Sequence, residues 1–189
     1  MPSPIAHASL AALVLPAAGR RLDTIPAIVL IGLVAFWLVL PDFDFLVALV
    51  GLTDSVYSHG SWSHSVLWAV PAGLAFALAA RVVLPQGNRP GFWRLGAIGA
   101  IAFASHLVMD WANWGFGQAR GIMLLWPLDE SRFKSPVPLF VGAKWSEPGN
   151  LGAHAVTLST ELAFALVSVG IGLALSRRAR RNASTAEAP

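Results

Sequence analysis

The sequence predicts an all-α integral membrane protein, a helical bundle of about five helices with a long loop at the end that carries the polar motifs. Of its 189 residues, 56% are hydrophobic and only 12% are charged, whereas soluble domains carry about 25% charged residues. The apolar residues form long stretches without strand-like alternation, which favours helices. The pI is about 10.2, but the basic residues form no patch interleaved with aromatic residues, so no nucleic-acid partner is expected.

The expected helices are residues 5–18, 25–40, 66–80, 95–111 and 155–176. A full span needs about 20 residues, so several of these segments span only if the polar residues at their ends enter the membrane. The sequence leaves open whether 5–18 spans fully. No basic region precedes it and no clear cleavage site follows it, so we expect a retained segment rather than a signal peptide. Residues 1–176 form one predicted domain, and the basic, polar tail 177–189 is predicted to be disordered.

The distribution of basic residues predicts the orientation. If the five segments alternate in direction, nine of the 13 Lys and Arg residues fall on one side, namely Arg20, Arg21, Arg81, Arg89, Arg94, Arg177, Arg178, Arg180 and Arg181. Because cytoplasmic loops carry the excess of Lys and Arg, the C-terminus is expected in the cytoplasm. The N-terminus and the polar motifs are then expected on the outer face.

The long connection 113–150 lies on the motif side in this topology and is rich in Gly, Pro and Trp. We expect it to fold over the motifs as a lid or collar. Tryptophans in and next to it suit a belt at the level of the lipid headgroups, namely Trp111, Trp114, Trp126 and Trp145.

Two motifs at the ends of the second and fourth segments offer metal ligands. His106 and Asp110 are spaced i,i+4, so they project from one face of a helix and could hold one ion. Asp42 and Asp44 follow Pro41, and acids at a helix C-terminus need a compensating charge nearby. The chain has no cysteine, so any ligands are nitrogen and oxygen atoms.

A third motif, His59-Gly60-Ser61-Trp62-Ser63-His64-Ser65, precedes the third segment. The two histidines are five residues apart and would not share a face of one helix, but a loop that enters a helix could bring them together. We expect His64 to act as a ligand or acid–base group, and His59 as a ligand or general acid. Ser63 and Ser65 are expected to cap the helix.

Three further candidates lie on the same predicted side. His7 is near the start of the first segment, and Glu161 lies inside the fifth apolar segment, where a carboxylate needs a partner. Both are predicted metal ligands. His154 precedes Glu161 by two turns and is a weaker candidate. Asp129, Glu130, Arg132 and Lys134 are predicted to form a solvated turn, with Arg132 or Lys134 also able to meet an anionic substrate.

Taken in order, these motifs resemble the inner-membrane-associated metal-dependent hydrolases of bacteria and archaea. The family pattern is an early His, then Pro-Asp-x-Asp-His, His-Arg-Gly-x-Thr-His-Ser, Ser-His-x-x-x-Asp and Leu-Leu-Trp-Pro. The matching residues run from His7 to about Phe140 and include Ser105-His106-x-x-x-Asp110 and Leu124-Leu125-Trp126-Pro127. Phe45 stands where many relatives have His, and Gly60 stands where they usually have Arg.

The resemblance implies a multi-pass protein of the inner membrane that binds a divalent metal, most simply zinc, and hydrolyses a phosphoester or lipid-type substrate with metal-activated water. The family is similar in turn to zinc phospholipases C and P1-type nucleases, whose His-x-x-x-Asp helix matches His106 and Asp110. Their following His-x-x-x-Glu has no counterpart here, because His154 and Glu161 are seven residues apart.

Two other classes of function stay open at this point. A non-catalytic membrane protein could use the same residues for a structural or sensory metal site, since structural sites fill every position with protein ligands. A transporter would place polar groups near the midplane and show an internal repeat. The polar residues here gather at one end instead, which disfavours transport.

Overall fold

In the part of the chain that the structure describes, the protein is a bundle of five α-helices joined by 3₁₀ segments, in agreement with the all-α prediction. The computed structural model describes residues 2–18, 25–44, 46–47, 50–51, 58–86, 90–114, 120–137, 139–142, 147 and 149–186. The elements in chain order are α1 (Pro4–Ser9), η1 (Leu10–Ala18), α2 (Ile25–Val39), η2 (Leu40–Asp44), η3 (Trp62–His64), η4 (Val66–Trp68), α4 (Ala69–Val83), α5 (Phe92–Trp111) and α6 (Leu151–Ala186). Within these ranges no strand is present, only two isolated bridges.

Four helical stretches are long and apolar enough to cross a membrane, namely Ala27–Asp44, Val66–Val83, Phe92–Trp111 and Leu151–Ala179. The apolar helix Pro4–Val14 is shorter. The first two of these stretches reach spanning length only by including 3₁₀ turns, and one of them includes both Asp42 and Asp44. Asp42, Asp44, His106 and Asp110 therefore belong to the ends of two spans, as the short apolar segments predicted, whereas His59 and His64 precede the span Val66–Val83.

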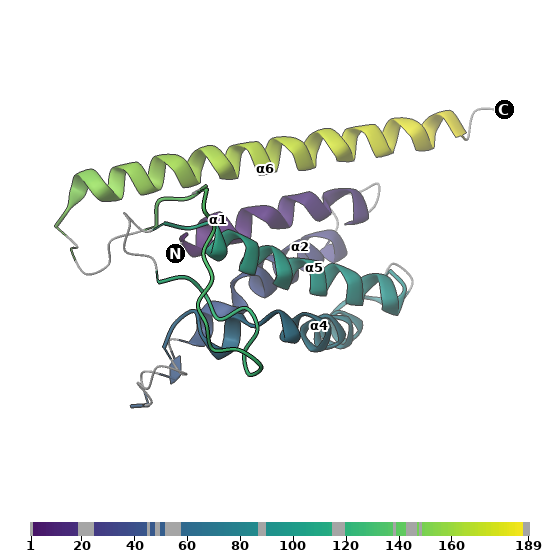
Figure 1. The fold of residues 1–189 in the computed structure, drawn as a ribbon. Helices are drawn as coiled ribbons and strands as arrows, with labels where there is room; N and C mark the ends of the chain where they lie inside the picture. The colour runs from purple at the N-terminus through teal and green to yellow at the C-terminus, as the bar shows by residue number, and fades with distance from the viewer. Residues whose placement is uncertain are drawn as a thin grey trace.

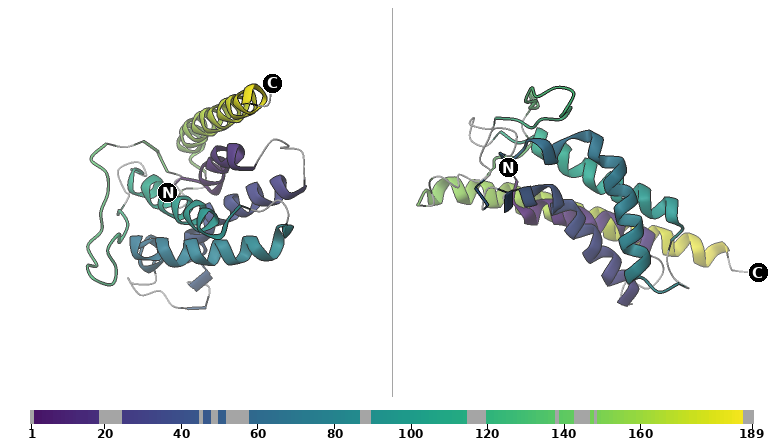
Figure 2. Two further views of the ribbon diagram at one scale, coloured as in Figure 1. Left: turned by 90° about the vertical axis from the view of Figure 1, so that its right-hand side faces the viewer. Right: turned by 90° about the horizontal axis from the view of Figure 1, so that it is seen from below.

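The helices lie in a bundle with α6 along one side. Figure 1 shows α1 and η1 between α6 and the remaining helices, and α2 and η1 pack against each other. The two views in Figure 2 show α4 and α5 on the side of the bundle away from α6. The main apolar core lies between α2, α4 and α5, around Trp37, Leu38 and Phe76.

Glycines allow the closest helix contacts. A Cβ on Gly99 of α5 would lie 2.3 Å from the Cβ of Phe76 on α4, and one on Gly73 would lie 2.5 Å from the carbonyl oxygen of Gly96. A Cβ on Gly172 of α6 would lie 2.2 Å from the carbonyl oxygen of Ala12 in η1. Small residues at helix interfaces are the usual means of bringing membrane helices together, because lipid supplies no hydrophobic drive between them.

The structure differs from the sequence prediction at both ends. The first segment divides into the short helix α1 and the 3₁₀ segment η1. The last helix continues to Ala186, so the part of the tail predicted to be disordered is helical up to that residue. Arg and Ala are good helix formers, and adding residues to an established helix costs little. Phe45, Asp54, Trp145 and the loop arginines Arg20, Arg21 and Arg89 lie outside the described residues.

Candidate metal centre

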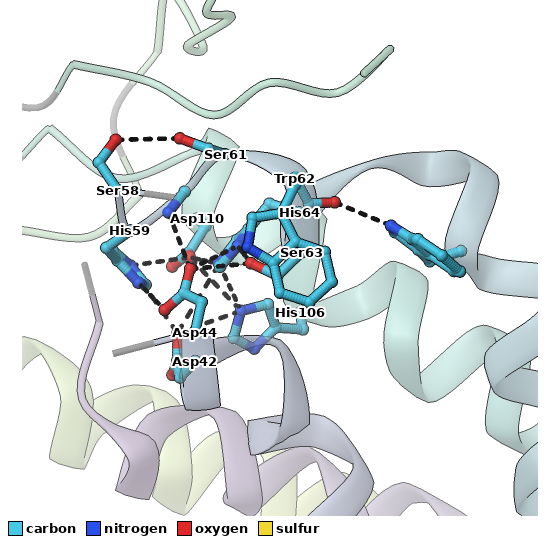
Figure 3. A network of polar contacts seen from close by, with 12 residues as sticks. Asp42, Asp44, Ser58, His59, Ser61, Trp62, Ser63, His64, His106 and Asp110 are labelled. Atoms are coloured by element: carbon cyan, nitrogen blue, oxygen red, sulfur yellow. Dashed lines mark hydrogen bonds and ion pairs between the residues drawn. The ribbon is translucent and has the colours of Figure 1, made fainter. Parts of the chain in front are cut away.

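Seven side chains from four parts of the chain meet at one end of the bundle, and we call them the His/Asp cluster. They are His7 of α1, Asp42 and Asp44 of η2, His59 and His64 of the segment before α4, and His106 and Asp110 of α5. Figure 3 shows six of them pointing toward one another around Asp110 and Asp42. The predicted convergence of the motifs is therefore present in the structure.

Local backbone chemistry sets where the loop side chains stand. Pro41 has no N–H to continue α2, so the α-helix ends at Val39 and the 3₁₀ turn η2 turns Asp42 and Asp44 inward. Gly60 has a φ of +78°, a conformation that favours glycine. Its N–H donates to Asp44 Oδ2 at 3.2 Å and its carbonyl accepts from the N–H of Met123 at 2.8 Å. The turn between His59 and His64 is thereby held on both sides.

One group of possible ligands consists of Asp42, His59, His64 and Asp110, whose donor atoms all lie within 4.8 Å of one another. His64 Nε2 is 3.0 Å from Asp110 Oδ2 and 3.7 Å from Asp42 Oδ1. Burial lowers the pKa of His64, but hydrogen bonds to Asp110 and Asp42 outweigh it, and the net shift is upward. His59 is the member of this group that reaches solvent, with 35% of its side chain exposed.

A second group consists of His7, His106 and Asp110, all buried. His7 Nε2 is 3.4 Å from Asp110 Oδ1, and its ring stacks on that of His106 with 4.0 Å between centroids. Asp110 belongs to both groups, and its Oδ2 faces His64 and His106 whereas its Oδ1 faces His7. The predicted i,i+4 pair of His106 and Asp110 is confirmed as a close contact, at 3.4 Å.

Two groups outside the ligand sets orient His106 and His64. His106 Nδ1 is 2.6 Å from the carbonyl oxygen of Leu38, which fixes Nδ1–H as the donor and leaves Nε2 free toward Asp42 and Asp110. Ser63 Oγ donates to Asp44 Oδ2 and lies 2.8 Å from His64 Nδ1. Such second partners set the tautomer and direction of histidine ligands.

Asp44 belongs to the cluster, but its predicted role as a metal ligand does not fit the geometry. Its Oδ1 accepts from His59 Nδ1 at 2.8 Å, and its Oδ2 accepts from Gly60 N–H and Ser63 Oγ. Both oxygens are thus occupied by protein donors, and Asp44 lies outside both ligand groups. It orients His59 and the turn that carries His64.

The unpaired atoms of the cluster fit a bound cation. Both ring nitrogens of His7, both carboxylate oxygens of Asp42 and Oδ1 of Asp110 are buried without a hydrogen-bond partner among the described residues. Buried polar groups are almost always paired, and an unpaired carboxylate is costly. The orphaned atoms belong to members of the two ligand groups. The donor set therefore fits one or two divalent ions with nitrogen and oxygen ligands.

Glu161 is not placed as a ligand, which corrects its prediction. Its Oε1 accepts from the backbone N–H of Ser3 at 2.6 Å, and its Oε2 accepts from the hydroxyl of Ser3. Ser3 is the N-cap residue of α1, where free backbone N–H groups attract an anion. Glu161 thus joins α6 to the start of the helix that carries His7. His154 lies in α6 and contacts the carbonyl of Glu147 instead of the cluster.

The long loop lies on the cluster side, as predicted. Arg132 donates to the hydroxyls of Ser58 and Ser61 at 2.8 and 2.6 Å and to the carbonyl of Gly121 at 3.1 Å. Its guanidinium would be 3.4 Å from a Cβ on Gly60. Burial and the nearby Arg120 lower the pKa of Arg132. Arg132 therefore fastens the loop to the histidine turn rather than belonging to a purely solvated turn, whereas Asp129 is exposed and bonds Ser131.

The two serines next to His64 have different roles. Ser65 caps the following turn as predicted, since its Oγ accepts from the N–H of Leu67, and it also donates to the carbonyl of Trp126 at 2.6 Å. Ser63, predicted as a cap, instead bridges Asp44 and His64. The Leu38 carbonyl was missed altogether, because a backbone acceptor 68 residues away from His106 leaves no signal in the sequence.

The fold and the cluster define a multi-pass, all-helical membrane protein with a buried His/Asp site that could hold metal. The chain belongs to the YdjM inner membrane protein family, whose profile it matches over residues 1–182. The family places it in the inner membrane, in agreement with the four apolar helices. Comparison with curated proteins and with solved structures gave no match.

Proposed function

We propose that the protein is a membrane-embedded, metal-dependent hydrolase that cleaves a phosphoester or related ester of a lipid-type substrate. The observation that carries this proposal is the central position of Asp110, which belongs to both ligand groups, with Oδ1 facing His7 and Oδ2 facing His64 and His106. A carboxylate shared in this way is suited to hold two divalent cations. Two-ion sites are typical of enzymes that act on phosphoesters.

Each ligand set could be completed by a non-protein ligand. His7, His106 and Asp110 would supply three ligands to one ion, and Asp42, His64 and Asp110 would supply three to the other, with His59 reserved for proton transfer. Catalytic zinc sites usually have three protein ligands and a position for water, whereas structural sites have four. The imidazole and carboxylate donors and the family resemblance favour zinc. Divalent ions bound here would polarise an ester oxygen and lower the pKa of water toward about 7.

We assign proton transfer to His59. Its Nε2 is 3.8 Å from Asp42 Oδ1 and 4.0 Å from Asp110 Oδ2, so the ring edge faces the ligand sets. Its Nδ1–H donates to Asp44, which holds the ring in this direction. A histidine oriented by a carboxylate and open to solvent can exchange protons with water and with a leaving group. Asp44 acts here as a positioning residue.

The competing function is a structural or sensory metal site without catalysis. Its support is that His59 also lies within reach of the first ligand set, which would then have four protein ligands. The solvent exposure of His59 favours the hydrolase. The two functions differ in outcome when His59 is replaced: a fourth structural ligand would lower metal content, whereas a proton-transfer group would lower turnover only.

The test is metal analysis of the purified full-length chain, followed by a screen of phosphomonoesters and phosphodiesters with and without chelator. We expect stoichiometric metal and chelator-sensitive hydrolysis, loss of metal in His106→Ala, and retained metal with reduced turnover in His59→Ala. Asp129→Asn serves as a matched control, because this exposed carboxylate lies outside the cluster. Metal-free protein, or metal content unchanged in His106→Ala, would refute the proposal.

We also propose that the cluster faces the outer side of the membrane and the C-terminus faces the cytoplasm, because Arg81, Arg94 and Arg178 belong to the ends of α4, α5 and α6 away from the cluster. The chain contains no cysteine, so single cysteines report topology directly. An impermeant maleimide added to intact spheroplasts should label Ser131→Cys, on the cluster side, and leave Arg178→Cys unlabelled until the membrane is opened. The reverse pattern would place the site in the cytoplasm.

A further inference from the structure

An apolar cavity of about 590 Å³ adjoins the His/Asp cluster. Its lining comes from the end of α2 and η2, from the segment of η3 and η4, from α4 and from Phe103 of α5. Asp44 and Ser63 are the polar residues of this lining, and both also contact cluster histidines. We propose that this cavity holds one hydrocarbon chain of the substrate, with the ester of the same molecule at the cluster. This inference rests on the proposed function.

The size and lining of the cavity suit a chain of this kind. Binding sites for small molecules typically measure 300–1,000 Å³ and combine an apolar wall with a few polar groups that fix orientation. The lining residues Trp37 and Asp44 are seven residues apart, which corresponds to roughly 10–14 Å along the span at 1.5 Å per α-helical and 2.0 Å per 3₁₀ residue. That length covers roughly a third to a half of the hydrocarbon thickness of a bilayer.

The edge of the cavity is formed by apolar side chains that remain partly exposed. Phe43 is 37% exposed, Trp68 is 38% exposed and Leu46 is 45% exposed. Phe43 and Trp68 belong to two different candidate spans, Ala27–Asp44 and Val66–Val83. At membrane depth these side chains face lipid rather than water. A hydrocarbon chain can therefore pass from the bilayer into the cavity without crossing water.

One lining residue of the cavity carries a buried donor without a partner among the described residues. The indole Nε1 of Trp62 is buried and has no hydrogen-bond partner among the described residues, and Trp62 belongs to the lining. Buried donors are rarely left unpaired, and such an exception calls for an explanation. An ester or phosphoryl oxygen lying between the cavity and the cluster would accept this hydrogen bond. The structure thus assigns the substrate class as an amphiphile with one chain in the cavity.

Binding is tested without any need for turnover. Purified protein in nanodiscs is irradiated with a dodecyl phosphate that carries a diazirine near the chain end, and the labelled peptides are mapped. We expect label on peptides containing 37–47 and 62–75, suppressed by excess dodecyl phosphate and reduced at least fivefold in Ala75→Phe, which fills the cavity. Val82→Phe is the matched control, because Val82 is on the same helix, is 85% exposed and lies outside the lining.

Turnover gives the second test. With phosphoesters of increasing alkyl length, kcat/KM should rise by roughly fourfold per buried methylene until the cavity is filled, the factor that corresponds to ~0.8 kcal/mol. Ala75→Phe should flatten this series and Val82→Phe should not. Competed cavity labelling without hydrolysis of any ester would refute the hydrolase and retain the chain site. Hydrolysis that is indifferent to chain length, or labelling spread evenly over exposed helix faces, would overturn the chain site.

Discussion

Replacing Asp110 by Asn is expected to remove both bound ions, whereas replacing His7 by Ala removes one. Asp110 is the residue that the two ligand groups share, and His7 belongs to one group alone. Asn keeps the shape of the side chain but loses the negative charge, so any effect reflects charge rather than packing. Metal analysis of the wild type should give two ions per chain. The same measurement should give none in Asp110→Asn and one in His7→Ala.

Thermal stability supplies an independent readout of the same difference. With free metal at 100 times Kd, each site stabilises the folded state by about 2.7 kcal/mol. For a chain of this length, 1 kcal/mol corresponds to roughly 2–4 °C in Tm. Chelator should therefore lower the Tm of the wild type by roughly 10–20 °C, that of His7→Ala by about half as much, and that of Asp110→Asn hardly at all.

The control for this series is Asp129→Asn, which makes the same chemical change on an exposed carboxylate near the cluster. It should keep both ions and the full response to chelator. If Asp110→Asn retains one ion and half of the chelator response, Asp110 does not join two sites. The single-ion alternative would then replace the arrangement proposed above.

Three further substitutions test the positioning role of Asp44, the helix packing at Gly99 and the contact between Glu161 and α1. Asp44→Asn should weaken metal affinity by roughly 10–100-fold without lowering the number of ions bound at saturation. Competition with a fluorescent chelator measures both quantities, and loss of an ion at saturating metal would show that Asp44 is a ligand. In thermal unfolding, Gly99→Ala should destabilise the bundle by about 1–3 kcal/mol, because the new Cβ meets Phe76. Gly96→Ala is the control and should change the Tm little, since its Cβ would be 3.7 Å from the nearest atom. Equal Tm values for the two variants would contradict the packing. Glu161→Gln should lower the metal affinity of the group that contains His7 and leave the other group unchanged, so that one of two phases in a metal titration weakens. Weakening of both phases would indicate a general loss of folding.

The pair His106 and Asp110 was predictable because helical periodicity alone brings residues four apart onto one face. The remaining cluster members were found by their order along the chain and by the resemblance, not by spacing. His59 and His64 do not share a helix face, and only the loop and η3 bring their rings within 4.8 Å between centroids. For such residues the sequence gives the donor types, whereas long-range packing decides where they meet.

Asp44 shows a second limit of the sequence. Two carboxylates that follow Pro41 are equivalent in composition, and neither could be ranked as the ligand. The difference arises from contacts 15 to 19 residues away, where His59, Gly60 and Ser63 occupy both oxygens of Asp44. In the described part of the chain the oxygens of Asp42 accept no hydrogen bond, and histidine Nε2 atoms lie 3.4 and 3.7 Å from its Oδ1. Which of two neighbouring acids is free to bind metal is therefore a property of the tertiary structure.

Glu161 satisfies the sequence argument in an unexpected way. A carboxylate inside an apolar helix needs a partner, and it has one in Ser3, at the other end of the chain. No periodicity or motif relates residues 158 apart. The contact joins α6 to α1, and α1 carries His7, whose ring makes no hydrogen bond with any residue that the structure describes. Glu161, which was predicted to bind metal, is thus better placed to position the helix that carries the ligand His7.

The cost of burying these acids also explains their arrangement. A carboxylate at the end of a span is expensive unless a cation or several donors face it. Asp44 meets this need with three protein donors, and Glu161 does so with Ser3. Among the described residues Asp42 has no hydrogen bond and only histidine nitrogens 3.4–3.8 Å from its Oδ1, and Asp110 keeps one oxygen without a hydrogen bond. The fold thus provides hydrogen-bond donors for two buried acids and leaves oxygens of the two most central acids without them. A cation from outside the chain would stabilise these oxygens, which is the physical basis for expecting bound metal here.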